Sequence, residues 1–323
     1  MPASIERAGP WIFGTGFRAA SASALFEQMR EALGEAGSSM SRVARLDQYY
    51  PDARCVPAYH QARKLAFGEG QIAPSTSIIV SALQSPDAQM DVQVIAATTA
   101  SGYVVEPVRA GLNRPDASGY TPCLRVGDMI FVAGQLARDA SGKLAVQGIA
   151  PETGYIVRHR LSPALEAAQS SLDLVLKAQV YVSNPEELPA FSEAWERAFA
   201  GRVPPTTVVL LQHPAFFTAE ATVEINLIAA HRSAAGRVRE IEGGARALDG
   251  LLFVPGLSGT NMGDIIDRAS RIFAAAGCDL ARVVRMLVFT ADLADLRVPQ
   301  IPFTAVKVPT GLTVDFWGYA PQP

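Results

Sequence analysis

The chain has 323 residues, of which 49% are apolar, and a formal net charge of −3. Proteins that bind nucleic acid usually concentrate basic residues on one face, so this charge balance gives no electrostatic footprint for such a partner. No apolar run approaches the roughly 18 residues of a membrane span, and the first residues lack the basic and then apolar pattern of a signal peptide. We therefore expect a globular, cytoplasmic protein that binds neither nucleic acid nor a membrane.

The cysteines and histidines give no sign of a cross-link or a metal site. The three cysteines stand far apart without a CxxC pair, and the odd count argues against a disulfide framework. We expect reduced thiols that are buried as small apolar groups: Cys55, Cys123 and Cys278. The four histidines form neither an HxH nor an HExxH pattern, so we expect no metal and no cofactor.

The first third of the chain predicts a unit of strands and helices. An apolar strand begins at Trp11 and runs into a glycine-containing turn, after which Leu25, Met29 and Leu33 recur with the spacing of one helix face. A basic and then extended segment follows at Arg45, and "CVPAYHQARKLAFGEG" predicts a second helix. The unit then closes with two strands separated by a turn.

The same order of elements returns from Met129, which indicates an internal repeat. Here the first helix is read from "SPALEAAQSSLDLVLK", Lys177 takes the place of Arg45, and "NPEELPAFSEAWERAFAG" predicts the second helix. This copy is longer, because "SGKLAVQGIAPETG" is inserted before the first helix. That insertion predicts an added hairpin or loop strand.

A third copy begins near Leu251, and its helix carries Ile265, Ala269, Ile272 and Phe273 on one face. The second helix is mostly missing from this copy. The repeating unit is therefore β-β-α-β-α-β-β with mainly antiparallel pairing, which is an α+β arrangement of helices on a sheet. The predicted units cover residues 1–104, 105–235 and 236–323.

The middle copy resembles the YjgF/RidA family, also called endoribonuclease L-PSP-like. The segments that carry the resemblance, in this order, are "SGYTPCLRVGDMIFVAGQLARDASGKLAVQG", "LKAQVYVSNPEELPAFSEAWERAF", "PPTTVVLL" and "ATVEINLIAA". In that family three identical subunits close their sheets into a central barrel with small-molecule pockets at the subunit interfaces. The resemblance implies that three fused copies form a single-chain pseudo-trimer with a chorismate-mutase-like central barrel, helices outside and three non-equivalent clefts, either as a monomer or as a dimer.

The best-known activity of that family is the hydrolysis of reactive imines and enamines to ammonia and a keto acid. Such a site needs a cation for the substrate carboxylate and an acid near the attacking water. The resemblance places the arginine on Pro205, Pro74 and Phe303. It places the acid on Asn226, Gln93 and Trp317. On this alignment no copy keeps either group.

Other lining residues of the family site are retained in the middle copy. Tyr120 matches the family tyrosine, Gly134 and Gln135 match the glycine turn, and Thr207 matches a hydroxyl or thiol position. The resemblance therefore implies a catalytic group of Thr207, Tyr120 and Asn226. The substrate-binding candidates are Gly134, Gln135, Pro205, Thr76 and Gln93.

Three acids and three cations also repeat along the chain. Asp91, Glu224 and Asp315 are aligned in the last strands of the three copies, and the cations are Arg45, Lys177 and Arg285. We expect them to form repeated ion pairs, in the interior or at an interface, rather than a catalytic centre.

Two functions remain open from the sequence. The first is a RidA-like hydrolase or deaminase that acts on a small imine, enamine or related metabolite in a cleft between two copies. The alternative is a non-catalytic protein that holds a small molecule or a partner in the same clefts. The missing arginine and acid favour binding, whereas Tyr120, Thr207 and Asn226 favour an enzyme.

Overall fold

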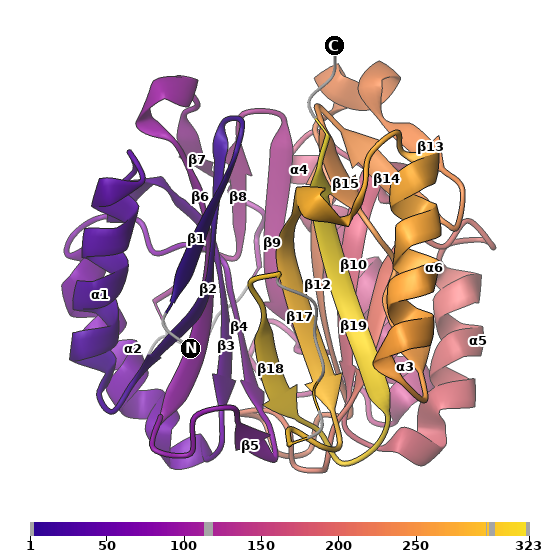
Figure 1. The fold of residues 1–323 in the computed structure, drawn as a ribbon. Coiled ribbons are helices and arrows are strands. Elements are labelled where there is room, and N and C mark those ends of the chain that lie inside the picture. Colours follow the sequence, from indigo (N-terminus) through magenta and orange to yellow (C-terminus); the bar gives the residue numbers. More distant parts are fainter. Residues whose placement is uncertain (1–2, 113–118, 295, 297–300, 321–323) are drawn as a thin grey trace.

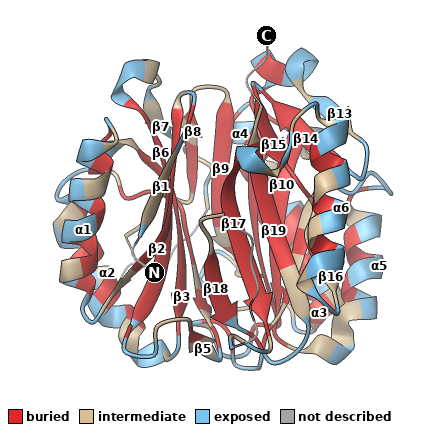
Figure 2. Cartoon of the chain, viewed as in Figure 1, coloured by how far each residue is buried: buried red, intermediate tan, exposed pale blue. Residues whose placement is uncertain are grey.

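A computed structural model describes residues 3–112, 119–294, 296 and 301–320. Three β-sheets stand around a common interior, and helices lie on the outside (Figure 1). Figure 2 shows that the strands are buried over most of their length, whereas the outward faces of the helices are exposed. We call each sheet with its helices the first, second or third unit.

The first unit has the strand order β1-β2-β6-β3-β4. Its strands are β1 (Ser4–Ala8), β2 (Trp11–Ala19), β3 (Val43–Tyr50), β4 (Ser75–Ile79) and β6 (Met90–Ala97). Its helices are α1 (Ala22–Glu35) and α2 (Val56–Phe67). Leu25, Met29 and Leu33 are buried under α1, which confirms the helix face expected from their spacing.

The second unit repeats this order as β8-β9-β12-β10-β11, with β7 added beside β8. Its strands are β7 (Val105–Pro107), β8 (Cys123–Val126), β9 (Met129–Gln135), β10 (Val175–Val182), β11 (Thr206–Leu210) and β12 (Val223–Ala230). Its helices are α3 (Ile149–Ile156), α4 (Ser162–Ala167) and α5 (Leu188–Ala198). A π-helical turn, Val157–Leu161, joins α3 to α4.

The inserted segment of the second unit differs from the expectation. Its hairpin is reduced to a single bridge between Arg138 and Leu144, and helix α3 already begins at Ile149. The prediction of a helix only from Ser162 was therefore wrong at its start. Pro151 and Gly154 have low helix propensity, so the sequence did not indicate this helix. A proline is nevertheless tolerated in the first turn, because its missing N–H would have no intrahelical acceptor there.

The third unit again has the order β14-β15-β19-β17-β18, with β13 at one edge and β5 at the other. Its strands are β13 (Arg239–Ile241), β14 (Ala245–Leu248), β15 (Leu251–Phe253), β16 (Leu257–Gly259), β17 (Val283–Thr290), β18 (Thr304–Lys307) and β19 (Leu312–Tyr319). The edge strand β5 (Ala82–Leu83) comes from the first unit. One helix, α6 (Met262–Ala275), buries Ile265, Ala269, Ile272 and Phe273 as expected.

Pairing within the sheets is antiparallel except at one edge of each. The pairs β3–β4, β10–β11 and β17–β18 are parallel. A parallel pair needs a crossover connection, and α2 and α5 provide it in the first two units. The expectation of mainly antiparallel pairing is met, with this one exception per sheet.

The core has two kinds of layer. One apolar cluster in each unit lies between sheet and helices, and two further clusters draw on all three units. One shared cluster contains Phe13, Phe131 and Phe253, and the other contains Tyr49, Tyr181 and Phe289. The inner faces of the three sheets therefore pack on one another. Of the three cysteines only Cys123 is buried; Cys55 and Cys278 are half-buried, which corrects the expectation for those two, and all three are free.

Candidate functional site

The units meet at three junctions, each at the edge strand that follows a crossover. At the first junction, β4 contacts β9 and Thr76 bonds Asn226 of β12. At the second junction, β11 contacts β19 and Thr207 bonds Asp315. At the third junction, Thr304 of β18 bonds Asp91 of β6. The three threonines occupy equivalent positions, so the junctions can be compared residue by residue.

The strand register corrects the alignment of the acids. Tyr49 and Tyr181 stand opposite Asp91 and Glu224, and Thr313 takes the corresponding place opposite Phe289. Asp315 stands opposite Leu287, in the register that Gln93 and Asn226 occupy in the other units. The alignment of Asp315 with Glu224, and of Trp317 with Asn226, was therefore wrong by two residues. The third unit does keep an acid at this position.

The second junction is closed by charge pairing. Lys177 Nζ lies 2.5 Å from Asp315 Oδ1 and donates to Thr207 Oγ1 at 2.7 Å and to the Val254 carbonyl. Burial alone would raise the pKa of Asp315, but Lys177 and Arg285 hold it below its usual value. A Cβ atom on Gly256 would come within 2.8 Å of Thr207 Cα, so the backbones are in close contact. The Thr207 hydroxyl is thus held by hydrogen bonds to Lys177 and Asp315 in a structural network.

The network continues through the shared interior. Arg285 Nη2 lies 2.5 Å from Asp47 Oδ2, and Arg285 Nε donates to Gln93 Oε1 at 2.9 Å. Asp47 also accepts from Arg45 at 2.7 Å. The expected repeated ion pairs are therefore only partly correct: Asp315 pairs with two of the cations, whereas Asp91 and Glu224 pair with none of the three in the described part of the chain.

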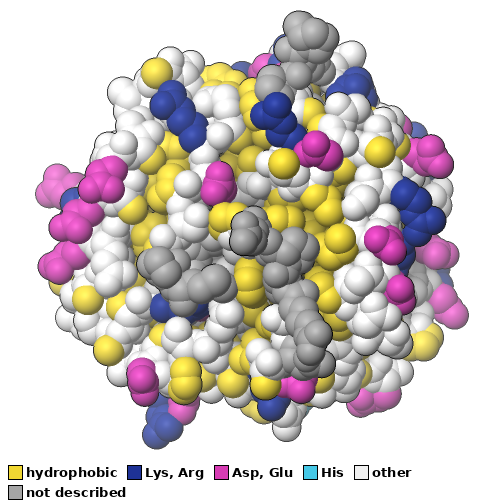
Figure 3. All heavy atoms as spheres, viewed as in Figure 1, with side chains coloured by type: hydrophobic (Ala, Val, Ile, Leu, Met, Phe, Trp, Pro, Cys, Tyr) yellow, Lys and Arg dark blue, Asp and Glu magenta, His cyan; other side chains and the backbone are white. Residues whose placement is uncertain are grey.

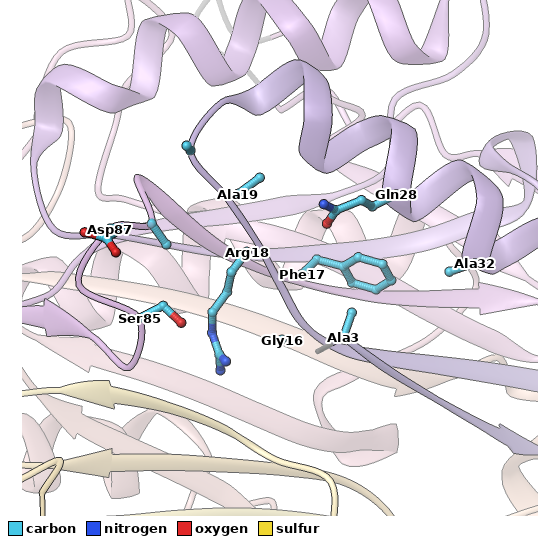
Figure 4. A pocket seen from close by; sticks show the side chains of 11 residues that line it. Ala3, Gly16, Phe17, Arg18, Ala19, Gln28, Ala32, Ser85 and Asp87 are labelled. Atoms are coloured by element: carbon cyan, nitrogen blue, oxygen red, sulfur yellow. The ribbon is translucent and has the colours of Figure 1, made fainter. Parts of the chain in front are cut away.

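The third junction uses a different cation. Arg18 Nε lies 2.5 Å from Asp91 Oδ2, and Arg18 Nη2 donates to Gln84 Oε1 at 2.9 Å. Burial raises the pKa of Asp91 to about 6 in spite of this pair. A pocket of about 510 Å³ lies beside Arg18 and is lined by the first unit alone, including Gln28 of α1 and Ser85 (Figure 4).

The first junction holds an acid with no ion pair among the described residues. Asn226 Nδ2 donates to Thr76 Oγ1 at 3.0 Å, so a neutral pair stands where the second junction has Thr207 and Asp315. Glu224 is only 7% exposed, and its carboxyl group lies so close to Gly134 that a Cβ atom there would overlap it. Burial raises the pKa of Glu224 to about 8, although the charges of Arg138 and Arg45 oppose the shift. Glu224 is therefore mostly protonated at neutral pH.

Tyr120 lies near this acid, and the charges of three arginines act on Tyr120. Tyr120 packs on the core of the first unit, and the backbone of the next residue, Thr121, donates to the Ile72 carbonyl at 2.9 Å. Burial and the nearby Glu224 raise the pKa of Tyr120, whereas the positive charges of Arg138, Arg160 and Arg63 lower it. A tyrosine, a protonated carboxyl and guanidinium groups from two units therefore converge at the first junction.

The second unit fixes two of these arginines. Arg160 lies in the π-helical turn and donates to Gln135 Oε1 at 3.2 Å and to the Arg138 carbonyl at 3.4 Å. Arg138 itself donates to Thr218 Oγ1. Single π-helical turns inside α-helices are frequent at functional sites. Here Arg160 lies in such a turn and bonds Gln135.

The candidates named from the sequence separate into three places. The first junction brings together Tyr120, Asn226, Thr76, Gly134 and Gln135. Thr207 and Pro205 belong to the second junction, where the Pro205 carbonyl accepts from the Ala178 N–H, and Gln93 lies in the interior beside Arg285. From the sequence, Glu224 was expected in an ion pair, and Arg138, Arg160 and Arg63 were not named for this site. Only the register across the sheets could have identified Glu224 for this site.

The described residues lack two features. They contain no group of three or more histidine, cysteine, aspartate or glutamate side chains that could hold a metal ion. None of the helices described is long and apolar enough to cross a membrane.

The middle of the chain is similar to known proteins. The family model described as endoribonuclease L-PSP matches residues 111–231. A RutC family protein of Pyrococcus abyssi is 30% identical over 90 residues, which are 28% of this chain and 71% of the relative. Protein HMF1 of Saccharomyces cerevisiae is 26% identical over 116 residues, which are 36% of this chain and 87% of that protein.

One solved structure extends the likeness beyond the middle unit. A chorismatase crystal structure matches with a TM-score of 0.54 and 16% identity, over 71% of this chain and 77% of that one. At this identity the match shows a shared fold and not a shared activity. The sequence relatives, the family model and the junction residues retained in the middle unit together lead to one conclusion: the chain belongs to the YjgF/RidA family, the endoribonuclease L-PSP family.

Proposed function

We propose that the protein is a hydrolase of small imines or enamines and that its active site is the first junction. The observation that supports this most directly is Glu224, a buried carboxyl group with a pKa of about 8 that lies between the first and second units. A general acid is most effective when its pKa lies near the working pH. Such a group holds a proton at neutral pH and still releases it readily.

The proposed reaction starts with the Glu224 proton. Glu224 donates it to the imine nitrogen, or to the β-carbon of an enamine, which makes the neighbouring carbon electrophilic. Water adds to that carbon while the Glu224 carboxylate removes a proton from the water. Glu224 then returns this proton to the amine nitrogen of the adduct, the C–N bond breaks and ammonia leaves. The hydroxyl proton of the adduct passes to the Glu224 carboxylate, which leaves a C=O group and restores the acid.

The other residues of the first junction orient the substrate in this proposal. Tyr120, Asn226 and Thr76 supply hydroxyl and amide groups, and Gln135 is held in place by Arg160. Gly134 leaves room for the Glu224 carboxyl group. Thr207 takes no part, because its hydroxyl is bonded to Lys177 and Asp315.

Ammonia release from freshly generated 2-aminoacrylate, measured across pH, tests the proposal. The acid must be protonated to act, so the rate should stay high below pH 8 and fall as the pH rises through about 8. Glu224→Gln should lower kcat by about 100-fold or more. Asp91→Asn, which alters the equivalent acid of the third unit, serves as the matched control and should keep the rate. A wild-type rate at background would refute the hydrolase.

The proposal includes the architecture that the equivalent sheets support. Three units of equal strand order, with boundaries near residues 104 and 235, would form a pseudo-trimer in one chain with a closed central barrel. Sedimentation should then show a particle of one chain or a dimer, and a trimer of chains would contradict this part of the proposal.

A second candidate is a non-catalytic binding protein of the same fold. It is favoured by Pro205 and Pro74, which stand where related proteins are expected to carry an arginine. Binding of a keto acid at the first junction without any release of ammonia would select this alternative.

A further inference from the structure

Strands β3, β10 and β17 carry a cation at the same register position, directly after a shift in register: Arg45, Lys177 and Arg285. Two of these cations bond the neighbouring unit. Lys177 pairs with Asp315, and Arg285 donates to Gln93 Oε1. Asp315 and Gln93 share one register position, which Asn226 occupies in the second unit. A cation at this position can therefore reach across its junction.

Arg45 makes no such bond across its junction in the described part of the chain. Its Nε and Nη2 atoms donate to Asp47 Oδ1 at 2.9 and 2.7 Å, within the same strand. Both side chains are buried. The other Asp47 oxygen lies 2.5 Å from Arg285 Nη2. Two guanidinium groups therefore hold the Asp47 carboxylate, and Arg45 is bound inside its own unit.

An uncharged residue takes the place of Asp47 in the other two units. The equivalent positions, which stand opposite the threonine of each junction in the parallel pair, hold Gln179 in the second unit and Leu287 in the third. Neither side chain can bind a cation as a carboxylate does. Lys177, two residues before Gln179, accordingly donates to the threonine of its junction and pairs with Asp315.

The Glu224 carboxyl lies next to this part of the first unit. Asp47 stands opposite Thr76, and the Thr76 hydroxyl lies 3.1 Å from the point where a Cβ atom on Gly134 would stand. The Glu224 carboxyl overlaps the same point. The acid and the threonine hydroxyl are thus neighbours, as an acid and a threonine are at the second junction.

The charged and titratable groups near Glu224 come from three places. Arg45 and Asp47 lie on β3, Arg138 follows β9, and Tyr120 precedes β8. The two arginines favour the ionised carboxyl, whereas Asp47 opposes its ionisation. Neither arginine forms an ion pair with Glu224 in the structure described.

We propose that Asp47 is a positioning residue of the first junction, which holds the Arg45 guanidinium away from Glu224 and so prevents the kind of ion pair that closes the second junction. This inference rests on the site assigned in the proposed function. Without Asp47, Arg45 would bond Glu224 as Lys177 bonds Asp315, and the acid would give up its proton. Asp47 need not touch the substrate, because it acts through Arg45.

Titration of the Glu224 carboxyl by ¹³C NMR tests the inference without turnover. The signal is assigned in protein labelled at the glutamate carboxyl carbons, as the one absent from Glu224→Gln. Its midpoint in wild type should lie near pH 8. Asp47→Gln copies the second unit and should lower the midpoint by about one to three pH units, because an opposite charge in contact favours the carboxylate by that much. Arg45→Gln combined with Asp47→Gln should restore a midpoint near 8, since this variant has no released Arg45.

Asp91→Asn is the matched control, because Asp91 is a buried acid of the first unit that pairs with a different arginine, Arg18. It should leave the midpoint unchanged. If Asp47→Gln does not fold, Asp47→Asn replaces it. The inference is overturned if the wild-type midpoint lies at an ordinary glutamate value, if the Asp47 variant keeps the wild-type midpoint, or if the double variant titrates as low as the single one. The expected midpoints without any release of ammonia would support the inference and refute only the hydrolase.

Discussion

The first and second junctions have the same framework, but the first holds a neutral hydrogen-bonded pair where the second holds a charged one. Both place a threonine of an edge strand against a polar side chain of the neighbouring unit, Thr76 with Asn226 and Thr207 with Asp315. At the second junction Lys177 balances the acid, and every partner is buried. At the first junction the partner is a neutral amide, and the acid stands two residues earlier at Glu224. In the proposed function, the second junction stabilises the fold and the first junction supplies the protonated acid.

The largest effect on stability is expected from the acid of the second junction. Asp315→Asn leaves Lys177 buried without its carboxylate and weakens the contact with Arg285. Breaking one partner out of a buried pair typically costs about 3–5 kcal/mol. Urea unfolding should therefore show a large loss for Asp315→Asn and a much smaller one for Asn226→Ala, which removes the neutral partner of the first junction. Equal losses would show that the two junctions do not differ in this way.

Two glycine substitutions separate the roles of the junctions. Gly134→Ala places a methyl group on the Glu224 carboxyl, so it should lower kcat at least tenfold with a modest loss of stability. Gly256→Ala presses on the Thr207 backbone, so it should lower the free energy of unfolding by about 1–3 kcal/mol and leave kcat nearly unchanged. Steady-state kinetics and urea unfolding on both variants give the comparison. A large fall in kcat for Gly256→Ala would contradict it.

The pH dependence of stability tests the raised pKa of Glu224. Glu224 has a pKa of about 8 in the folded protein and a lower one when unfolded, so the unfolded chain loses its proton first as the pH rises. Its contribution is fully present below the unfolded pKa and is lost as the pH rises through about 8. Wild type should therefore lose up to a few kcal/mol between pH 5 and pH 8 relative to Glu224→Gln. Parallel pH profiles of unfolding for the two proteins would contradict this.

The smallest effect is expected when the first junction is made to resemble the second. Asn226→Asp introduces a second carboxyl near Glu224, and Arg45, which takes the place of Lys177 at this junction, is already paired with Asp47. Two neighbouring acids resist joint ionisation, so the alkaline limb of the pH–rate profile should move upward by less than about one unit. The kinetic profile of this variant checks the direction. A downward shift would contradict the electrostatic picture of the site.

The sequence predicts the elements better than the junctions. Helical periodicity correctly identifies the buried faces of α1 and α6, and Tyr120, Asn226 and Thr76 do lie together. The acids of the last strands were misaligned because a shift of two residues keeps the same alternation of inward and outward side chains. Only pairing across the sheet distinguishes Asp315 from Glu224.

Two arginines beside the insertion were missed for a different reason. Arg138 precedes the inserted segment and Arg160 follows it, and this part of the chain has no counterpart in the other units to align with.

The surface shows how unevenly the units are covered. In the view of Figure 3, hydrophobic side chains gather in the middle of the face, while charged side chains lie mainly toward its rim. In Figure 1 the strands of the first and third units occupy this middle region, between α1 and α6. In the described residues the third unit carries one α-helix on its sheet, whereas the first unit carries two.

The two-residue strand β5 has a consequence for how the chain can be divided. Leu83 and Ala82 of the first unit pair with Val306 and Lys307, and the Ser81 N–H donates to the Lys307 carbonyl at 2.9 Å. The last sheet is thus completed by a strand of the first unit, which ties the first unit to the third. A fragment containing only the last unit would expose the unpaired edge of β18, and such edges recruit other strands. Gene fragments cut at the unit boundaries should therefore yield aggregating protein, even though each sheet has its own apolar core.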